Sequence, residues 1–162
     1  MHLTEFFKWL QETRVGSGIS DSLWLFPFIE TIHVLGIVIL VGATGILDLR
    51  LMGFALKRQP VSQLSKQLMP WAWSGFAIML ITGSLLFSSE STKLYNNGAF
   101  LFKMGLIVLA GVNAIVFQTT VYKTIGTWDE APVAPMGARL AGCCSLLVWI
   151  GVVAAGRWIA YW

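Results

Sequence analysis

The sequence predicts an all-α integral membrane protein, a four-helix bundle preceded by a short interfacial amphipathic helix. Hydrophobic residues make up 56% of the 162 residues and charged residues only 12%, about half the charged fraction of a typical soluble domain. The mean hydropathy is +0.72, and the charges cluster so that long apolar stretches remain between them. The formal net charge of +3 gives no basis for a nucleic-acid partner. We treat residues 1–162 as a single transmembrane domain.

The first expected element is an amphipathic helix over about residues 3–14. Leu3, Phe6, Phe7 and Leu10 lie on one face of this helix, and Trp9 is expected at headgroup level. The following stretch "VGSGISDS", residues 15–22, is expected to break the helix because of its glycines and serines.

Four apolar stretches, each long enough to cross a bilayer, follow. Pro60 is expected to open the second helix, whose membrane part starts at about residue 68. The aromatic residues that end the fourth stretch are typical of an interfacial belt. Short polar connections make sequential helices antiparallel neighbours, which favours a bundle. The expected spans cover about residues 23–47, 68–87, 99–121 and 140–161.

Basic residues predict the orientation of the bundle. Arg50, Lys57, Arg58 and Lys66 lie at or after the end of the first span, whereas the loop after the second span has only Lys93. The positive-inside rule therefore places the first loop in the cytoplasm. In a bacterial inner membrane both termini would then be periplasmic.

Four ionisable residues fall within the spans, where a charge is costly and usually faces the protein interior or a cavity. From the helical rise, Glu30 and Lys103 lie roughly 7–9 Å, Arg157 about 10 Å and His33 about 3 Å to the outer side of the midplane. They come from three different helices but share one half of the membrane. This clustering makes them the candidate site.

Glu30, His33 and Gly36 share a helix face by their spacing. In one interpretation, His33 is the axial ligand of a haem b, Gly36 leaves space for the porphyrin, and Lys103 and Arg157 hold the propionates. Glu30 would pair with either cation or orient His33. In a second, Glu30 and His33 bind a metal such as copper.

A third interpretation needs no cofactor. In it, Glu30 pairs with Lys103 or Arg157, and His33 makes a neutral hydrogen bond to a serine or threonine of another span.

Other polar residues have more ordinary interpretations. Asp48 and Arg50 are expected at the membrane interface, with contact to a substrate or quinone headgroup as the alternative. Asn113 and Gln118 are expected to form hydrogen bonds between helices. The adjacent Cys143 and Cys144 point about 100° apart on a helix, which disfavours a disulfide between them.

Three motifs resemble known membrane proteins. These are "IHVLGIVILVGATGILDLRLM" in the first span, "LSKQLMPWAWSGFAIMLITGSLLF" in the second and "AFLFKMGLIVLAG" in the third. Together they resemble the HemJ-type protoporphyrinogen oxidases and the related CopD-type copper-resistance proteins. The organisation is most similar to that of a family of uncharacterised, short, four-span bacterial proteins.

The resemblance to HemJ-type proteins implies a haem b and roles for a first-span histidine and a third-span lysine, which match His33 and Lys103. The chain departs from that family in the stretch "GVNAIVFQTT", which lacks the further histidine that the family commonly carries there.

The sequence thus favours an inner-membrane haem b protein that transfers single electrons between the membrane pool and a periplasmic or membrane partner. Whether the protein is an enzyme stays open. The alternatives are a HemJ-like porphyrinogen oxidase, a CopD-like copper-handling protein and a cofactor-free subunit of a larger membrane complex. Lipid is an expected partner, and a homo-oligomer stays open.

Overall fold

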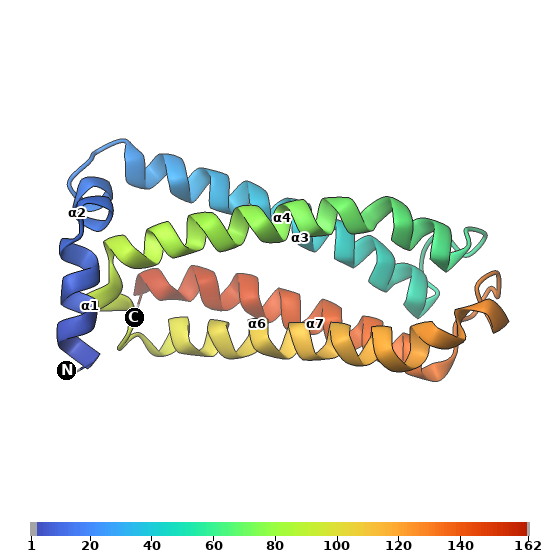
Figure 1. Ribbon diagram of the computed structural model, residues 1–162. Helices are drawn as coiled ribbons and strands as arrows, with labels where there is room; N and C mark the ends of the chain where they lie inside the picture. The colour runs from blue at the N-terminus through green and yellow to red at the C-terminus, as the bar shows by residue number, and fades with distance from the viewer. Residues whose placement is uncertain (1–2, 162) are drawn as a thin grey trace.

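The computed structural model describes residues 3–161, and in this range the fold is the predicted all-α bundle of four long helices (Figure 1). Short N-terminal helices precede the bundle. Each of the four long stretches is long and apolar enough to cross a membrane, so the chain is a multi-pass membrane protein. The long helices are α3 (Leu25–Met52), α4 (Val61–Ser89), α6 (Gly98–Val116) and α7 (Met136–Trp158).

Shorter elements extend or connect these four. The π-helix η1 (Phe117–Val121) and the 3-10 helix η2 (Tyr122–Thr127) prolong α6, and the 3-10 helix η3 (Ile159–Tyr161) prolongs α7. The helices therefore run beyond the expected spans at most ends, since their last turns carry polar residues that a hydropathy pattern does not mark. The remaining elements are α1 (Leu3–Glu12), α2 (Arg14–Ser20) and α5 (Ser91–Leu94).

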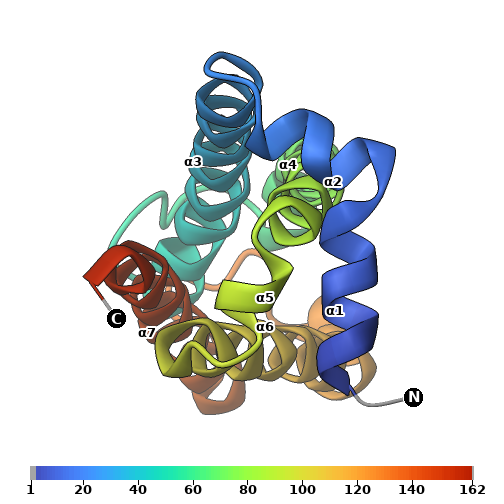
Figure 2. The same cartoon turned by 90° about the vertical axis from the view of Figure 1, so that its left-hand side faces the viewer.

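The bundle has two different ends. One carries α1, α2, α5 and both ends of the described chain, and we call it the terminus end (Figures 1 and 2). The other carries the connections 53–60 and 128–135, and we call it the loop end. Helix α3 packs mainly on α4 and α7, and α6 packs mainly on α7.

Two hydrophobic clusters fill the bundle. The central cluster joins all four helices, and the second seals the loop end by including residues of the α6–α7 connection. The central cluster contains Leu40, Met79, Ala110, Val148, Trp149 and Val152. The loop-end cluster contains Leu51, Val61, Phe117, Trp128, Ala134 and Ala138.

Two glycines let α3 and α4 pack with their backbones in close contact. A Cβ atom at Gly75 would lie 2.7 Å from the Leu40 nitrogen and 2.9 Å from the Gly36 oxygen. A Cβ atom at Gly36 would lie 2.8 Å from Ile78 Cγ2. Such small-residue contacts are typical of helix packing in membranes. The contacts of Gly36 and Gly75 therefore fix how the side chains of α3 and α4 face each other within one or two helical turns of these glycines.

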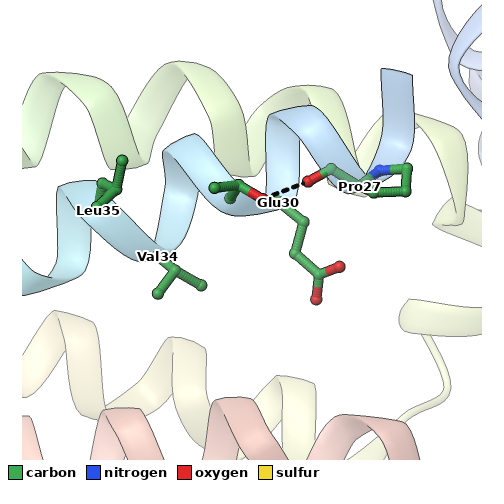
Figure 3. Close-up of a pocket in the computed structure, with 5 residues that line it drawn as sticks. Pro27, Glu30, Val34 and Leu35 are labelled. Atoms are coloured by element: carbon green, nitrogen blue, oxygen red, sulfur yellow. Dashed lines mark hydrogen bonds between the residues drawn. The ribbon is translucent and has the colours of Figure 1, made fainter. Parts of the chain in front are cut away.

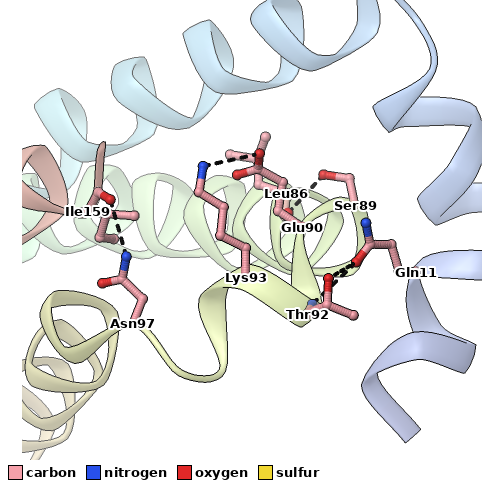
Figure 4. A network of polar contacts seen from close by, with 8 residues as sticks. All are labelled: Gln11, Leu86, Ser89, Glu90, Thr92, Lys93, Asn97 and Ile159. Carbon is pink, nitrogen blue, oxygen red and sulfur yellow. Dashed lines mark hydrogen bonds and ion pairs between the residues drawn. The ribbon is translucent and has the colours of Figure 1, made fainter. Parts of the chain in front are cut away.

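The terminus end is closed by α1 and α2. Helix α1 lies across the ends of the spans (Figure 2), where the Ser91 hydroxyl donates to the Phe7 carbonyl at 2.6 Å. The Phe7 ring stacks on Tyr95 with centroids 4.9 Å apart. Figure 4 shows the polar network that joins Gln11 of α1 to Thr92 and, farther along, Asn97 to the Ile159 carbonyl.

The break expected at residues 15–22 is wrong, because residues 14–20 form α2. The Thr13 hydroxyl accepts a hydrogen bond from the Gly16 amide and caps this helix. Gly16 then lies close to α4, where a Cβ atom would be 2.9 Å from the Ser88 carbonyl oxygen. A packing contact with α4 thus overrides the low helix propensity of the glycines and serines.

Candidate functional site

His33 is half-buried on the face of α3 that contacts α4. Its Nδ1 atom lies 2.8 Å from Thr82 Oγ1, and the same hydroxyl donates to the Ile78 carbonyl at 2.6 Å. A hydroxyl has a single hydrogen to donate, so Thr82 accepts a hydrogen bond from His33 Nδ1–H. In the neutral imidazole this arrangement leaves the lone pair of Nε2 free to bind a metal or another donor.

One glycine of α4 lies against the His33 ring, and Gly36 of α3 contacts α4. The ring packs over Gly83, where a Cβ atom would lie 3.2 Å from His33 Cε1. Gly36 has a different role from the one expected, because Ile78 fills the space beside it. Gly36 therefore packs α3 against α4 and leaves no gap for a porphyrin in this conformation.

Lys103 is half-buried on α6, with its side chain lying over Gly156 of α7. Its Nζ atom would be 3.5 Å from a Cβ atom at Gly156. The role of Lys103 at a haem propionate stays a prediction.

Acidic partners for Lys103 and Arg157 are absent from residues 3–161. The one ion pair in that range joins Lys93 and Glu90, whose Nζ and Oε1 atoms are 3.6 Å apart. The pairing of Glu30 with either cation, which the cofactor-free interpretation requires, is not formed. The hydrogen bond from His33 to a threonine of another span, which that interpretation also requires, is formed.

Glu30 is exposed and does not share the environment of His33. It lines an open cavity of about 310 Å³ on α3, together with Pro27, Thr31 and Val34. Figure 3 shows its carboxylate pointing away from its own helix, while the Thr31 hydroxyl donates to the Pro27 carbonyl at 2.7 Å. No hydrogen bond joins Glu30 to His33 in the described part of the chain, and Arg157 is likewise exposed near the end of α7.

Metal-ligating side chains do not gather elsewhere in the described residues. Between residues 3 and 161, no group of three or more histidine, cysteine, aspartate or glutamate side chains could hold a metal ion. His2, the only other histidine, lies outside the described range. His33 therefore supplies a single imidazole, which is one ligand for a haem iron but fewer ligands than a copper ion bound by side chains alone requires.

A second polar cluster lies at the loop end, where sequence reasoning placed Asp48 and Arg50 at the membrane interface. Both are buried, Arg50 at 0% and Asp48 at 5% exposure. Arg50 Nε donates to the Gln59 carbonyl at 2.9 Å, and Nη2 donates to the Ala131 carbonyl at 3.1 Å. Arg50 thus ties both loop-end connections to α3.

Asp129 completes this cluster at the N-terminus of α4. Its carboxylate accepts from the Ser62 amide at 2.7 Å and from the Ser62 hydroxyl. Burial raises the pKa of Asp129, but the hydrogen bonds from Ser62 and Val61 and the charge of Arg50 outweigh it and hold the pKa below its usual range. The α6–α7 connection therefore supplies the cap of a helix that is distant in sequence.

Two further polar predictions have different outcomes. Asn113 Nδ2 donates to the Ala141 carbonyl of α7 at 3.0 Å, so its predicted hydrogen bond between helices is confirmed. Gln118 is exposed in η1, so its side chain does not lie between helices as the sequence predicts. The sequence does not single out Thr82, although the cofactor-free interpretation expects a serine or threonine of another span in this role.

The sequence was compared with known proteins. A sequence model described as "Family of unknown function (DUF6644)" matches residues 6–162, which include all four spanning helices. The search of curated proteins and the search of solved structures gave no match. The comparisons therefore show no link to HemJ-type or CopD-type proteins.

Proposed function

The chain belongs to this family of unknown function (DUF6644), and we propose that it binds one haem b through Nε2 of His33. The observation that carries the proposal is the hydrogen bond between His33 Nδ1–H and Thr82. This bond fixes the ring orientation and leaves Nε2 as the free nitrogen, which is the arrangement that ligating histidines have in metal and haem sites.

Lys103 supports the proposal through its charge. A half-buried ammonium group without an acidic partner in residues 3–161 is costly inside a membrane. The carboxylate of a haem propionate would offset this cost. Arg157, farther toward the terminus end, is a second candidate for the same contact.

A bound haem would supply reversible one-electron chemistry at the iron. The protein would then pass electrons between the membrane pool and a periplasmic or membrane partner, in a bacterial inner membrane with both termini on the periplasmic side. His33 would bind the haem, Thr82 would orient the imidazole ring of His33, and Lys103 would hold a propionate of the haem. Since Ile78 fills the space beside Gly36, Ile78 or the two helices must shift when the group enters.

The test is an oxidised and a reduced visible spectrum of the detergent-purified protein, with a metal analysis of the same sample. We expect a Soret band and reducible α and β bands in the wild type and in His2→Ala, and their loss in His33→Ala. Copper without haem would favour the CopD-like alternative, and neither haem nor metal would favour a cofactor-free subunit. A porphyrinogen oxidase would in addition complement a strain that lacks this enzyme.

A further inference from the structure

A lipid-facing groove separates α6 and α7 at the terminus end. Its volume is about 500 Å³, and small residues of both helices form its floor, so the main chains leave a hollow between them. Two aromatic side chains flank it, each nearly two-thirds exposed. The floor includes Gly98 and Ala99 of α6 and Gly151 and Ala154 of α7, and the flanking side chains are Phe102 and Trp158.

The shape and chemistry of the groove suit a single apolar chain. From Gly151 to Trp158 it extends about 10 Å along α7, from the helical rise of about 1.5 Å per residue. No charged residue lines it. Because it opens sideways on two membrane-spanning helices, the molecules that reach it are those dissolved in the bilayer.

A cation lies level with the terminus end of this groove, although it does not line it. Arg157 precedes Trp158 and follows Ala154 by three residues, so its direction differs by about 60° from that of Ala154 around α7. Its side chain is exposed. In the described part of the chain no carboxylate lies within ion-pairing distance of Arg157. A guanidinium group at this level is suited to bidentate contact with a phosphate.

From the apolar groove and the cation at its end, we infer a binding site for an anionic phospholipid. One acyl chain lies in the groove between α6 and α7, and the phosphate contacts Arg157. The aromatic pair Phe102 and Trp158 encloses the chain near the headgroup, where aromatic residues are favoured. The groove does not include His33, and the inference goes beyond the proposed haem function, in which Arg157 is only the second candidate for the propionate contact.

The test measures lipid binding to the delipidated, detergent-purified protein by native mass spectrometry. The probes are dioleoyl phosphatidylglycerol and dioleoyl phosphatidylcholine, which share their chains and differ in headgroup charge. Arg157→Gln is expected to lower the affinity for phosphatidylglycerol about fivefold, the effect of one basic residue near an anionic lipid. Its effect on phosphatidylcholine should be small. Ala154→Phe fills the groove and is expected to weaken both lipids.

Matched controls separate this site from general attraction to the protein. Arg139→Gln removes the same charge from the other end of α7, and Ala114→Phe adds the same ring to an exposed position of α6 outside the groove. Neither should change binding. The inference is overturned if Arg139→Gln and Arg157→Gln have equal effects, or if Ala154→Phe binds both lipids as the wild type does.

Discussion

Replacing Gly75 with alanine should weaken the crossing of α3 and α4 on which the His33 site depends. The added methyl group would lie 2.7 Å from the Leu40 nitrogen, 2.9 Å from the Gly36 oxygen and 3.0 Å from Leu40 Cα. All three atoms belong to the main chain of α3, so no side-chain rotation can make room. The two helices must separate, at the cost of about 1–3 kcal/mol that overpacking usually has.

The matched control is Gly105→Ala on α6, because a Cβ atom there meets nothing within 4 Å. Both variants gain the higher helix propensity of alanine, worth about 1 kcal/mol. The difference between them therefore isolates the steric cost. Reversible unfolding in mixed micelles should show Gly75→Ala to be less stable than Gly105→Ala by about 1–3 kcal/mol. Equal stability of the two variants would refute the close crossing.

Three further predictions concern the hydrogen bonds described above. Thr82→Val should lower haem affinity about 10–100-fold, as loss of the hydrogen-bond partner of a ligating histidine commonly does. Thr82→Ser keeps the hydroxyl and should keep the affinity. A Soret titration that gives the same affinity for both variants would contradict the role of Thr82. The pKa of Asp129 is lower in the folded chain than its usual value of 3.8, so its carboxylate stabilises the fold above that pH, and this contribution is lost as the pH falls through the folded-state pKa. Asp129→Asn should therefore be less stable near neutral pH, and its free energy of unfolding should depend less on acid pH than that of the wild type. The same pH profile of unfolding in both proteins would argue against this role. Arg50→Lys should destabilise the protein by about 1.5–3 kcal/mol, because one ammonium group cannot reach the carbonyls of both Gln59 and Ala131 as the guanidinium does. An unchanged midpoint of thermal unfolding would count against this role of Arg50.

The four spans could be predicted from the sequence because hydropathy and helix length decide them, and the bundle follows from short connections. Most ends of the helices could not, because their last turns carry polar residues. Pro60 does mark the start of α4 at Val61, but the sequence gives no signal that Asp129 of a distant connection caps this helix. Trp128 of the same connection is 8% exposed, so this segment belongs to the core although its sequence is typical of a loop.

The candidate site was predicted in part. His33 and Lys103 are both half-buried, as expected of costly polar residues in a membrane bundle. Glu30 does not join them. Residues three apart on a helix differ by about 60° in direction, and at the edge of a contact this angle leaves Glu30 exposed while His33 faces α4. The roles of Thr82 and Gly36 depend on the register between α3 and α4, and a single sequence carries no signal for that register.

The central claim is that His33 binds a haem, and the most direct measurement is the reduced-minus-oxidised spectrum of the wild type beside His33→Ala. Both proteins should be purified identically, with monodispersity in detergent checked to show that the variant is folded. The account predicts a Soret band with reducible α and β bands in the wild type and none in folded His33→Ala. A wild-type spectrum without haem, or a folded variant that keeps the full Soret band, would contradict it.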